Sequence, residues 1–247
     1  MELRTEFSEL FLYADDCFDT ARKVMSLESK GTNKEAVSGI MFARCLSEYQ
    51  GAILLAEHGL PIESMTLSRA LYETAFVLGG LANDTVTPED LADHDFFIRR
   101  KMGNAVLNFA KNSSPEEIVS KLTTFIEEHT DASEVKFYNL AREAGMVNAY
   151  DGIYRHLSHF AAHPSITAAS DYYVDEGNGL GRVVLIRLTK YTPKAILFAS
   201  QGLMLACGCI EHISGTNAET NKEIKQRLDR EEELHEKYNP LDVNAAK

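Results

Sequence analysis

Apolar residues recur at intervals of three and four along most of the chain, which is the spacing of one face of an α-helix. The first such segment spans residues 2–28. A second helix is expected from Asn33, whose short side chain can cap its free amides, to about His58. A third is expected from Pro61 to about Asn83, so these two helices should form an antiparallel hairpin.

The helical spacing continues downstream, and it is interrupted at 171–188 by a β-branched run and a glycine-rich turn that predict one small β-hairpin. An ordered loop that covers a site is the alternative for this segment. We therefore expect a mainly all-α fold, an up-and-down bundle of about seven helices with one β-hairpin. Residues 1–214 should form the bundle domain, and residues 215–247 a charged C-terminal helix with a frayed tail.

The second and third helices repeat the pattern R-x-L-x-E, as Arg44 with Glu48 and as Arg69 with Glu73. In an antiparallel hairpin, Arg44 can lie beside Glu73 and Glu48 beside Arg69, because both pairs are centred on the same turn. One interpretation is a salt-bridge quartet that fixes the register of the two helices. Another is that the quartet supplies charge to a ligand or catalytic site. A carboxylate-bridged metal centre is disfavoured because neither helix carries Glu-x-x-His.

Composition narrows the function classes. The chain has 247 residues and a formal net charge of −12, and its N-terminus lacks the basic and apolar regions of a secretory signal. We expect a cytoplasmic protein with no membrane partner. The negative charge should repel long nucleic acids unless a basic pocket is locally concentrated. The four cysteines lack C-x-x-C spacing and are expected to be reduced core thiols.

Candidate chemistry gathers in residues 150–167, YDGIYRHLSHFAAHPSIT, which hold three of the eight histidines. The proline after His163 disfavours helical geometry there, so the helix should end at His163. A protonated histidine is favoured at a helix C-terminus, which makes His163 a candidate proton donor. Arg155 and His159 are four residues apart and therefore adjacent on the helix.

Four interpretations of this stretch remain open. Its histidines can cap the helix end beneath the hairpin, or His163, His159, Arg155 and Ser158 can form an acid/base or phosphate-contacting site. A metal triad of His156, His159 and His163 is disfavoured because the proline spoils their common face. The fourth interpretation is a partner-binding surface. Ser158 as a nucleophile would also need an orienting acid, for which Asp171 is nearest in sequence.

Two short motifs carry a resemblance. They are Arg69-x-x-x-Glu73 and Tyr154-x-x-Leu-Ser158-x-x-x-x-His163-Pro-Ser165. Over roughly residues 35–212 the chain resembles a widespread bacterial family of helical proteins of unknown function. The layout is also similar, more remotely, to the HEPN superfamily of helical bundles, which implies a dimeric ribonuclease of toxin–antitoxin or phage-defence systems.

The HEPN resemblance implies an arginine that precedes the catalytic histidine by five to seven positions. Here Ser158 stands five positions before His163, and Arg155 precedes His159 by only four. The departure leaves three outcomes open: an inactive relative, a different chemistry, or a site assembled with Arg69 and Glu73.

We carry two functional hypotheses forward. In the first, the protein is a divergent hydrolase of RNA or a nucleotide, with His163 as general acid/base, Arg155 or Arg69 holding phosphate, and Ser158, His159, Tyr154 and Ser165 beside them. In the second, it is a non-catalytic regulatory module whose acidic face binds a basic protein. Both predict a homodimer without a cofactor or metal. The site hypothesis also requires the polar cluster at the end of the 150–163 helix to face the Arg/Glu hairpin, formed by the second and third helices, across a shared cavity.

Overall fold

The expected fold class is confirmed: the protein is mainly α-helical with one two-stranded β-hairpin. The computed structural model describes residues 2–26, 31–177 and 179–238. Within them, seven of the α-helices have thirteen residues or more. These are α2 (Ser8–Met25), α3 (Asn33–Glu57), α4 (Pro61–Ala82), α5 (Pro88–Ser113), α6 (Glu116–Glu128), α10 (Thr192–Ser214) and α11 (Ala218–Tyr238).

Shorter elements join the long helices. They are α1 (Glu2–Glu6), α7 (Phe137–Glu143), α8 (Arg155–Leu157), α9 (Ile166–Ala169), the π-helical segments η1 (Ala149–Tyr154) and η2 (Ser158–Ala162), the 3-10 turns η3 (Ser170–Tyr172) and η4 (Thr189–Tyr191), and the strands β1 (Tyr173–Gly177) and β2 (Leu180–Val183).

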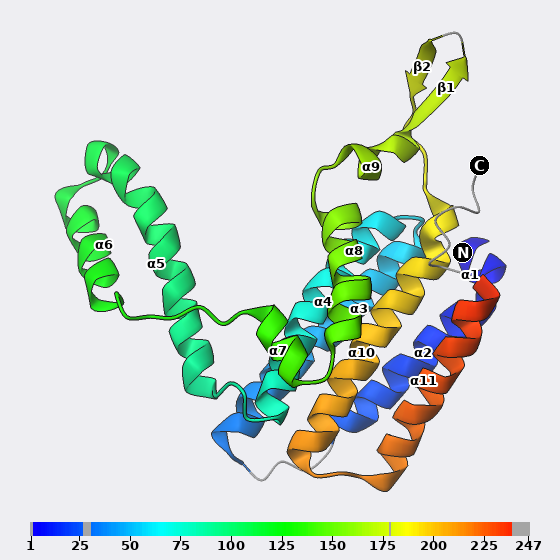
Figure 1. Ribbon diagram of the computed structural model, residues 1–247, viewed down its shortest axis with the longest axis horizontal. Coiled ribbons are helices and arrows are strands. Elements are labelled where there is room, and N and C mark those ends of the chain that lie inside the picture. Colours follow the sequence, from blue (N-terminus) through cyan, green and yellow to red (C-terminus); the bar gives the residue numbers. More distant parts are fainter. Residues whose placement is uncertain (1, 27–30, 178, 239–247) are drawn as a thin grey trace.

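Helix α10 is the centre of the bundle. It packs against α2, α3, α4 and α11, and Figure 1 shows these helices side by side. The segment Thr189–Ser214 is long and apolar enough to cross a membrane, but 72% of its apolar window is buried inside the protein. Its apolar composition is therefore accounted for by its central place in the core.

The helix boundaries differ from expectation at two places. The first helix is interrupted at Phe7, and residues 27 and 28 lie outside the described part of the chain. The cap of α3 is Thr32 rather than Asn33: Glu35 N donates to Thr32 Oγ1 at 3.2 Å, and Thr32 N donates to Glu35 Oε2 at 3.0 Å. This reciprocal pair satisfies two amides at once, which a lone Asn33 cap would not do.

The β-hairpin pairs Tyr173 with Val183 in antiparallel register and projects beyond the end of the bundle (Figure 1). Its second strand ends at Val183 and not at Leu188 as expected. The chain then returns to the α3–α4 turn, where Leu188 is buried and Arg187 lies against Gly59. Packing against the bundle replaces strand pairing for this segment.

Helices α5 and α6 form an arm that extends away from the bundle (Figure 1). They approach closely at Gly103, where a Cβ atom would lie 3.1 Å from Leu122 and 3.3 Å from Ile126. Helix α11, by contrast, packs on α2 and α10, with Ile224 and Leu234 buried. The expected domain boundary at residue 214 stays a prediction, and residues 239–247 lie outside the described residues.

Candidate functional site

The two R-x-L-x-E motifs form ion pairs within their own helices. Arg44 Nε lies 2.8 Å from Glu48 Oε1, and Arg69 Nη2 lies 2.9 Å from Glu73 Oε1. The expected cross-pairs between α3 and α4 were wrong. Arg44 is exposed to solvent. Besides its ion pair with Glu73, Arg69 donates hydrogen bonds to a third element. Glu48 contacts α4 through Thr74, whose hydroxyl donates to Glu48 Oε2 at 3.4 Å.

That third element is the segment of residues 150–167, which we call the central stretch, so the two sequence motifs meet in space. Arg69 Nε donates to Ser158 Oγ at 2.8 Å, and Arg69 Nη2 donates to the Tyr154 hydroxyl at 3.2 Å. The Tyr154 hydroxyl in turn donates to Glu73 Oε1 at 2.8 Å. We call Arg69, Glu73, Tyr154 and Ser158 the polar network. It links α4 to the helix that ends at Ala162.

The polar network is only partly shielded from water. The Arg69 and Glu73 side chains are 27% and 23% exposed, whereas Tyr154 is buried. Burial, and then the hydrogen bond to Glu73, raise the pKa of the Tyr154 hydroxyl, so it stays protonated as a donor near neutral pH. The Tyr154 ring packs edge-on against Phe76 and lies under the Arg69 guanidinium at 5.3 Å.

Two π-helical turns shape the central stretch. Segments η1 and η2 flank the single α-turn α8, and such turns are frequent at functional sites. Tyr154 and Ser158, four residues apart, both reach Arg69 on α4. The His163 amide donates to the Ser158 carbonyl at 3.0 Å, which sets His163 one π-turn after Ser158. The expected helix end is confirmed, since the helix stops at Ala162 and His163 is extended.

The three histidines have different environments. His159 and His163 are exposed, and neither joins the hydrogen bonds or ion pairs of the polar network. His156 stacks on Phe160 with ring centroids 5.3 Å apart. Burial, together with the charges of Lys194 and His159, lowers the pKa of the His156 imidazole to about 4. The described residues contain no group of three His, Cys, Asp or Glu side chains that could hold a metal ion.

Three further candidates take up contacts outside the network. Arg155 pairs with Asp151 at 2.8 Å on the solvent side of the helix. Ser165 caps α9, because its hydroxyl accepts from Ala168 N at 3.0 Å. The Asp171 carboxylate accepts from Lys190 and Tyr191, so a Ser158–His–Asp171 triad is not assembled in the described structure.

Sequence reasoning missed Lys194, which is almost fully buried in the first turn of α10. Burial lowers the pKa of its amine to about 8. Its Nζ lies 5.8 Å from the ring centre of Phe160 and 5.5 Å from that of Phe198. The only sequence signal was a lysine directly after the proline that opens an apolar helix. Thr66 was also missed; its hydroxyl donates to the Ala161 carbonyl at 3.3 Å and ties η2 to α4.

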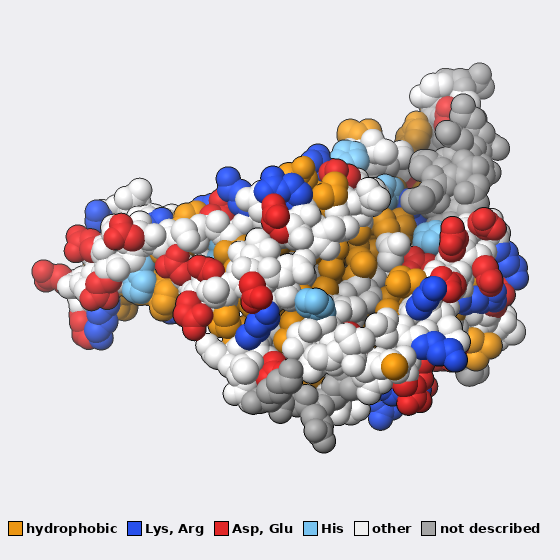
Figure 2. Space-filling view, turned by 60° about the horizontal axis from the view of Figure 1, so that its bottom comes forward, with side chains coloured by type: hydrophobic (Ala, Val, Ile, Leu, Met, Phe, Trp, Pro, Cys, Tyr) orange, Lys and Arg blue, Asp and Glu red, His pale blue; other side chains and the backbone are white. Residues whose placement is uncertain are grey.

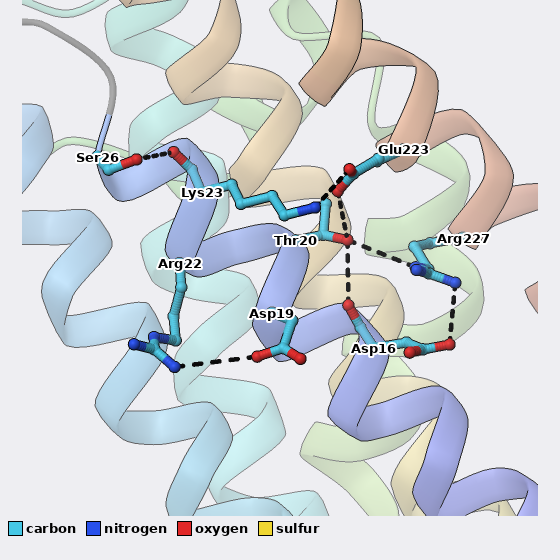
Figure 3. Close-up of a pocket in the computed structure, with 8 residues that line it drawn as sticks. All are labelled: Asp16, Asp19, Thr20, Arg22, Lys23, Ser26, Glu223 and Arg227. Atoms are coloured by element: carbon cyan, nitrogen blue, oxygen red, sulfur yellow. Dashed lines mark hydrogen bonds and ion pairs between the residues drawn. The ribbon is translucent and has the colours of Figure 1, made fainter.

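A depression with a volume of about 550 Å³ lies between α2 and α11 (Figure 3). Its charged side chains pair with each other: Lys23 with Glu223 at 2.5 Å, and Arg227 with Asp16 at 3.0 Å. These pairs hold α11 against α2. Because these charged side chains are already paired, they are not available to bind a charged ligand.

The protein is a helical bundle in which Arg69 and Glu73 of α4 bind Ser158 and Tyr154 of the central stretch. Residues 35–180 match a family of unknown function, DUF5677. This is more than half of the chain, and the protein belongs to that family. No curated protein and no solved structure matches the chain. The expected membership in a family of unknown function is confirmed, while the HEPN likeness stays a prediction.

Proposed function

We propose that the protein is a divergent HEPN-like hydrolase that acts on RNA or a nucleotide, with Arg69 as the phosphate-binding cation and His163 as the general acid/base. The observation that supports this is the 2.8 Å hydrogen bond from Arg69 Nε to Ser158 Oγ. Ser158 occupies the position where the HEPN motif would carry arginine. A guanidinium from α4 therefore lies beside the residue that lacks one.

The chemistry of arginine fits this role. A guanidinium stays protonated and offers five donors in a planar fork that matches phosphate oxygens. The contacts with Ser158, Tyr154 and Glu73 use Nε and Nη2, so Nη1 takes no part in them. Because the Arg69 side chain retains 27% exposure, an anionic ligand can reach it from solvent.

His163 suits proton transfer by its type and its place. Histidine is the side chain whose ordinary pKa lies closest to neutrality. In cleavage of an RNA phosphodiester, a 2′-hydroxyl gives its proton to solvent water and attacks phosphorus to form a 2′,3′-cyclic phosphate. The bond from phosphorus to the 5′-oxygen breaks as that oxygen takes up a proton. We assign that proton to His163, and we assign stabilisation of the charge on the phosphate oxygens to Arg69. Arg155 and His159 are exposed along the same helix.

The charge of the whole chain favours a small ligand. At a net charge of −12, each phosphate beyond the local site meets a repulsive field. A nucleotide or a short RNA end avoids most of this repulsion. We place such an activity in the cytoplasm, in a toxin–antitoxin or phage-defence system.

A non-catalytic regulatory or protein-interaction module of such a system is the second candidate. It is favoured by the closed character of the polar network, in which Arg69, Glu73, Tyr154 and Ser158 satisfy one another. In that case the network fixes the central stretch to α4, and the acidic surface binds a basic protein partner.

The chain offers matched controls for the test. Purified protein is incubated with total cellular RNA and, separately, with a panel of nucleotides, and products are followed by gel and by mass spectrometry. His163→Ala should lower the rate by roughly 10²-fold or more, as expected for loss of a general acid/base. His212→Ala, an exposed histidine at the end of α10, should leave the rate unchanged.

Arg69→Ala is compared with Arg44→Ala, which removes the arginine of the other R-x-L-x-E motif. Arg69→Ala should abolish turnover at a temperature where circular dichroism shows it folded, and Arg44→Ala should not. Equal activities for each variant and its control, or no product from the wild-type protein, would rule out the hydrolase and favour the interaction module.

A further inference from the structure

The arm formed by α5 and α6 has very little core of its own. α5 has 26 residues and so is roughly 39 Å long at 1.5 Å per residue. Only Gly103 and Ala110 of α5 are buried, and no residue of α6 is. A helix must bury its apolar face against another element to be stable. The packing of α5 on α6 therefore does not give the arm a buried apolar core of its own.

An exposed apolar face runs along the arm. Met102 is 64% exposed and Phe109 is 73% exposed, and the spacing of four, four and three places both on one side of α5 with Ile98 and Val106. Ile118 of α6 is exposed as well. Met102 and Val106 also line a groove of about 480 Å³ between the two helices. Figure 2 shows hydrophobic side chains among the charged ones on the arm, at the left of the view.

We propose that this face binds the same face of a second copy of the chain, with the two α5 helices antiparallel, so that two arms form a four-helix bundle. Residues at the same level then have numbers that sum to 207. Ile98 meets Phe109 of the second copy, and Met102 meets Ala105, so a large side chain faces a small one at the centre. Asp95 meets Asn112, which can donate a hydrogen bond to it.

The charges beside the apolar face favour the antiparallel orientation. Exposed Arg99 and Lys101 flank it on its two sides. A parallel, in-register pair would set Arg99 of each copy beside Lys101 of the other, which is repulsive. The antiparallel pair sets Arg99 at the level of Asn108 and Lys101 at the level of Val106 of the second copy. Charge compatibility therefore selects one arrangement of two identical helices.

The arrangement also closes. A two-fold axis between Gly103 and Asn104 uses the same α5 face on both copies, so neither α5 face is left to recruit a third copy. Because the arm extends away from the bundle, two arms can pair without bringing the acidic bundles into contact (Figure 1). The two copies each carry −12, so the dimer should tighten as salt screens their repulsion. Such a dimer does not depend on any catalytic role of Arg69.

Sedimentation equilibrium of the full chain, over a range of protein and salt concentrations, tests the surface. The wild-type protein should be a dimer, and Met102→Glu should weaken dimerisation by about 100-fold or more, because each dimer would bury two unpaired carboxylates. The matched control is Ile40→Glu on α3, where the isoleucine is 69% exposed. It should dimerise like the wild type. A monomeric wild type, or equal effects of the two variants, would overturn the proposal.

Cysteine cross-linking tests the orientation. All four native cysteines are buried and do not compete. A mixture of Met102→Cys and Ala105→Cys proteins should form a disulfide-linked heterodimer under mild oxidation, faster than either variant links to itself. Faster self-linking of Met102→Cys would overturn the antiparallel pairing, and the absence of any cross-link in either sample would overturn the α5 interface.

Discussion

Replacing Tyr154 by phenylalanine isolates the contribution of the polar network without disturbing its packing. The ring remains against Phe76 and Tyr150, and only the hydroxyl is lost. That hydroxyl accepts from Arg69 at 3.2 Å and donates to Glu73 at 2.8 Å. Both partners are charged, so the loss should exceed that of an ordinary neutral hydrogen bond.

The magnitude follows from the partners and their exposure. A hydrogen bond to a charged group contributes about 1.5–3 kcal/mol when it is shielded. Arg69 and Glu73 are about a quarter exposed, so water compensates in part, and we expect a loss of about 1–2 kcal/mol for Tyr154→Phe. For a chain of this length, that corresponds to a fall in Tm of roughly 2–8 °C.

Urea unfolding followed by circular dichroism measures this loss. The control is Tyr138→Phe, because Tyr138 also packs on Tyr150 but is exposed, and its hydroxyl makes none of the described hydrogen bonds. It should change the free energy of unfolding by less than about 0.5 kcal/mol. Adding Glu73→Gln to Tyr154→Phe should give a coupling of at least about 0.5 kcal/mol.

Equal free energies of unfolding for the Tyr154→Phe and Tyr138→Phe variants would refute the reasoning. They would mean that water replaces the network hydroxyl at no cost. Zero coupling between Tyr154 and Glu73 would likewise show that their 2.8 Å contact does not contribute to stability.

Three other predictions concern α10 and its neighbours. Lys194→Met should raise Tm at pH 7, because a buried ammonium is removed; this gain over the wild type should shrink between pH 8 and 10.5, where the folded wild-type amine loses its proton before the unfolded one does. The Tm of the His156→Phe variant should fall less than that of the wild type as pH falls from 6.5 toward 4, because in the wild type only the unfolded chain takes up a proton on His156. The Tm of His159→Phe, which changes an exposed site, should follow that of the wild type. Gly202→Ala should destabilise by about 1–3 kcal/mol, because its Cβ would lie 2.4 Å from the Leu71 side chain, whereas Gly208→Ala, with open space around it, should stabilise α10 by about 0.4–1 kcal/mol. Thermal scans over pH test the first two, and a Gly208→Ala variant less stable than the Gly202→Ala variant would contradict the third.

The local pattern of apolar residues was sufficient to predict where most of the helices lie. Apolar spacing located the cores of α2, α3 and α4, because a helix that packs on a bundle must carry a continuous apolar stripe. Pro164 correctly predicted the helix end at His163, since the proline ring restricts the residue before it. The cap of α3 was misplaced by one residue because Thr32 and Asn33 both have capping side chains.

The side chains that bind Arg69 could not be predicted from local sequence pattern. Spacing allowed Arg69 to pair with Glu48 across the hairpin or with Glu73 on its own helix, and both options satisfy the same charge. The contacts of Arg69 with Tyr154 and Ser158 accompany its pairing with Glu73. These two side chains reach Arg69 only because the central stretch packs along α4. The two π-turns of that stretch have no sequence signature.

The sequence also did not predict that the arm of α5 and α6 would lie apart from the bundle. The apolar face of α5 has the same spacing as the faces of helices in the core, so the sequence by itself determined an amphipathic helix there and not what covers it. The structure left Met102 and Phe109 in solvent. Periodicity is a property of one helix, whereas burial depends on which other helices lie beside it, and only the packed chain specifies those neighbours.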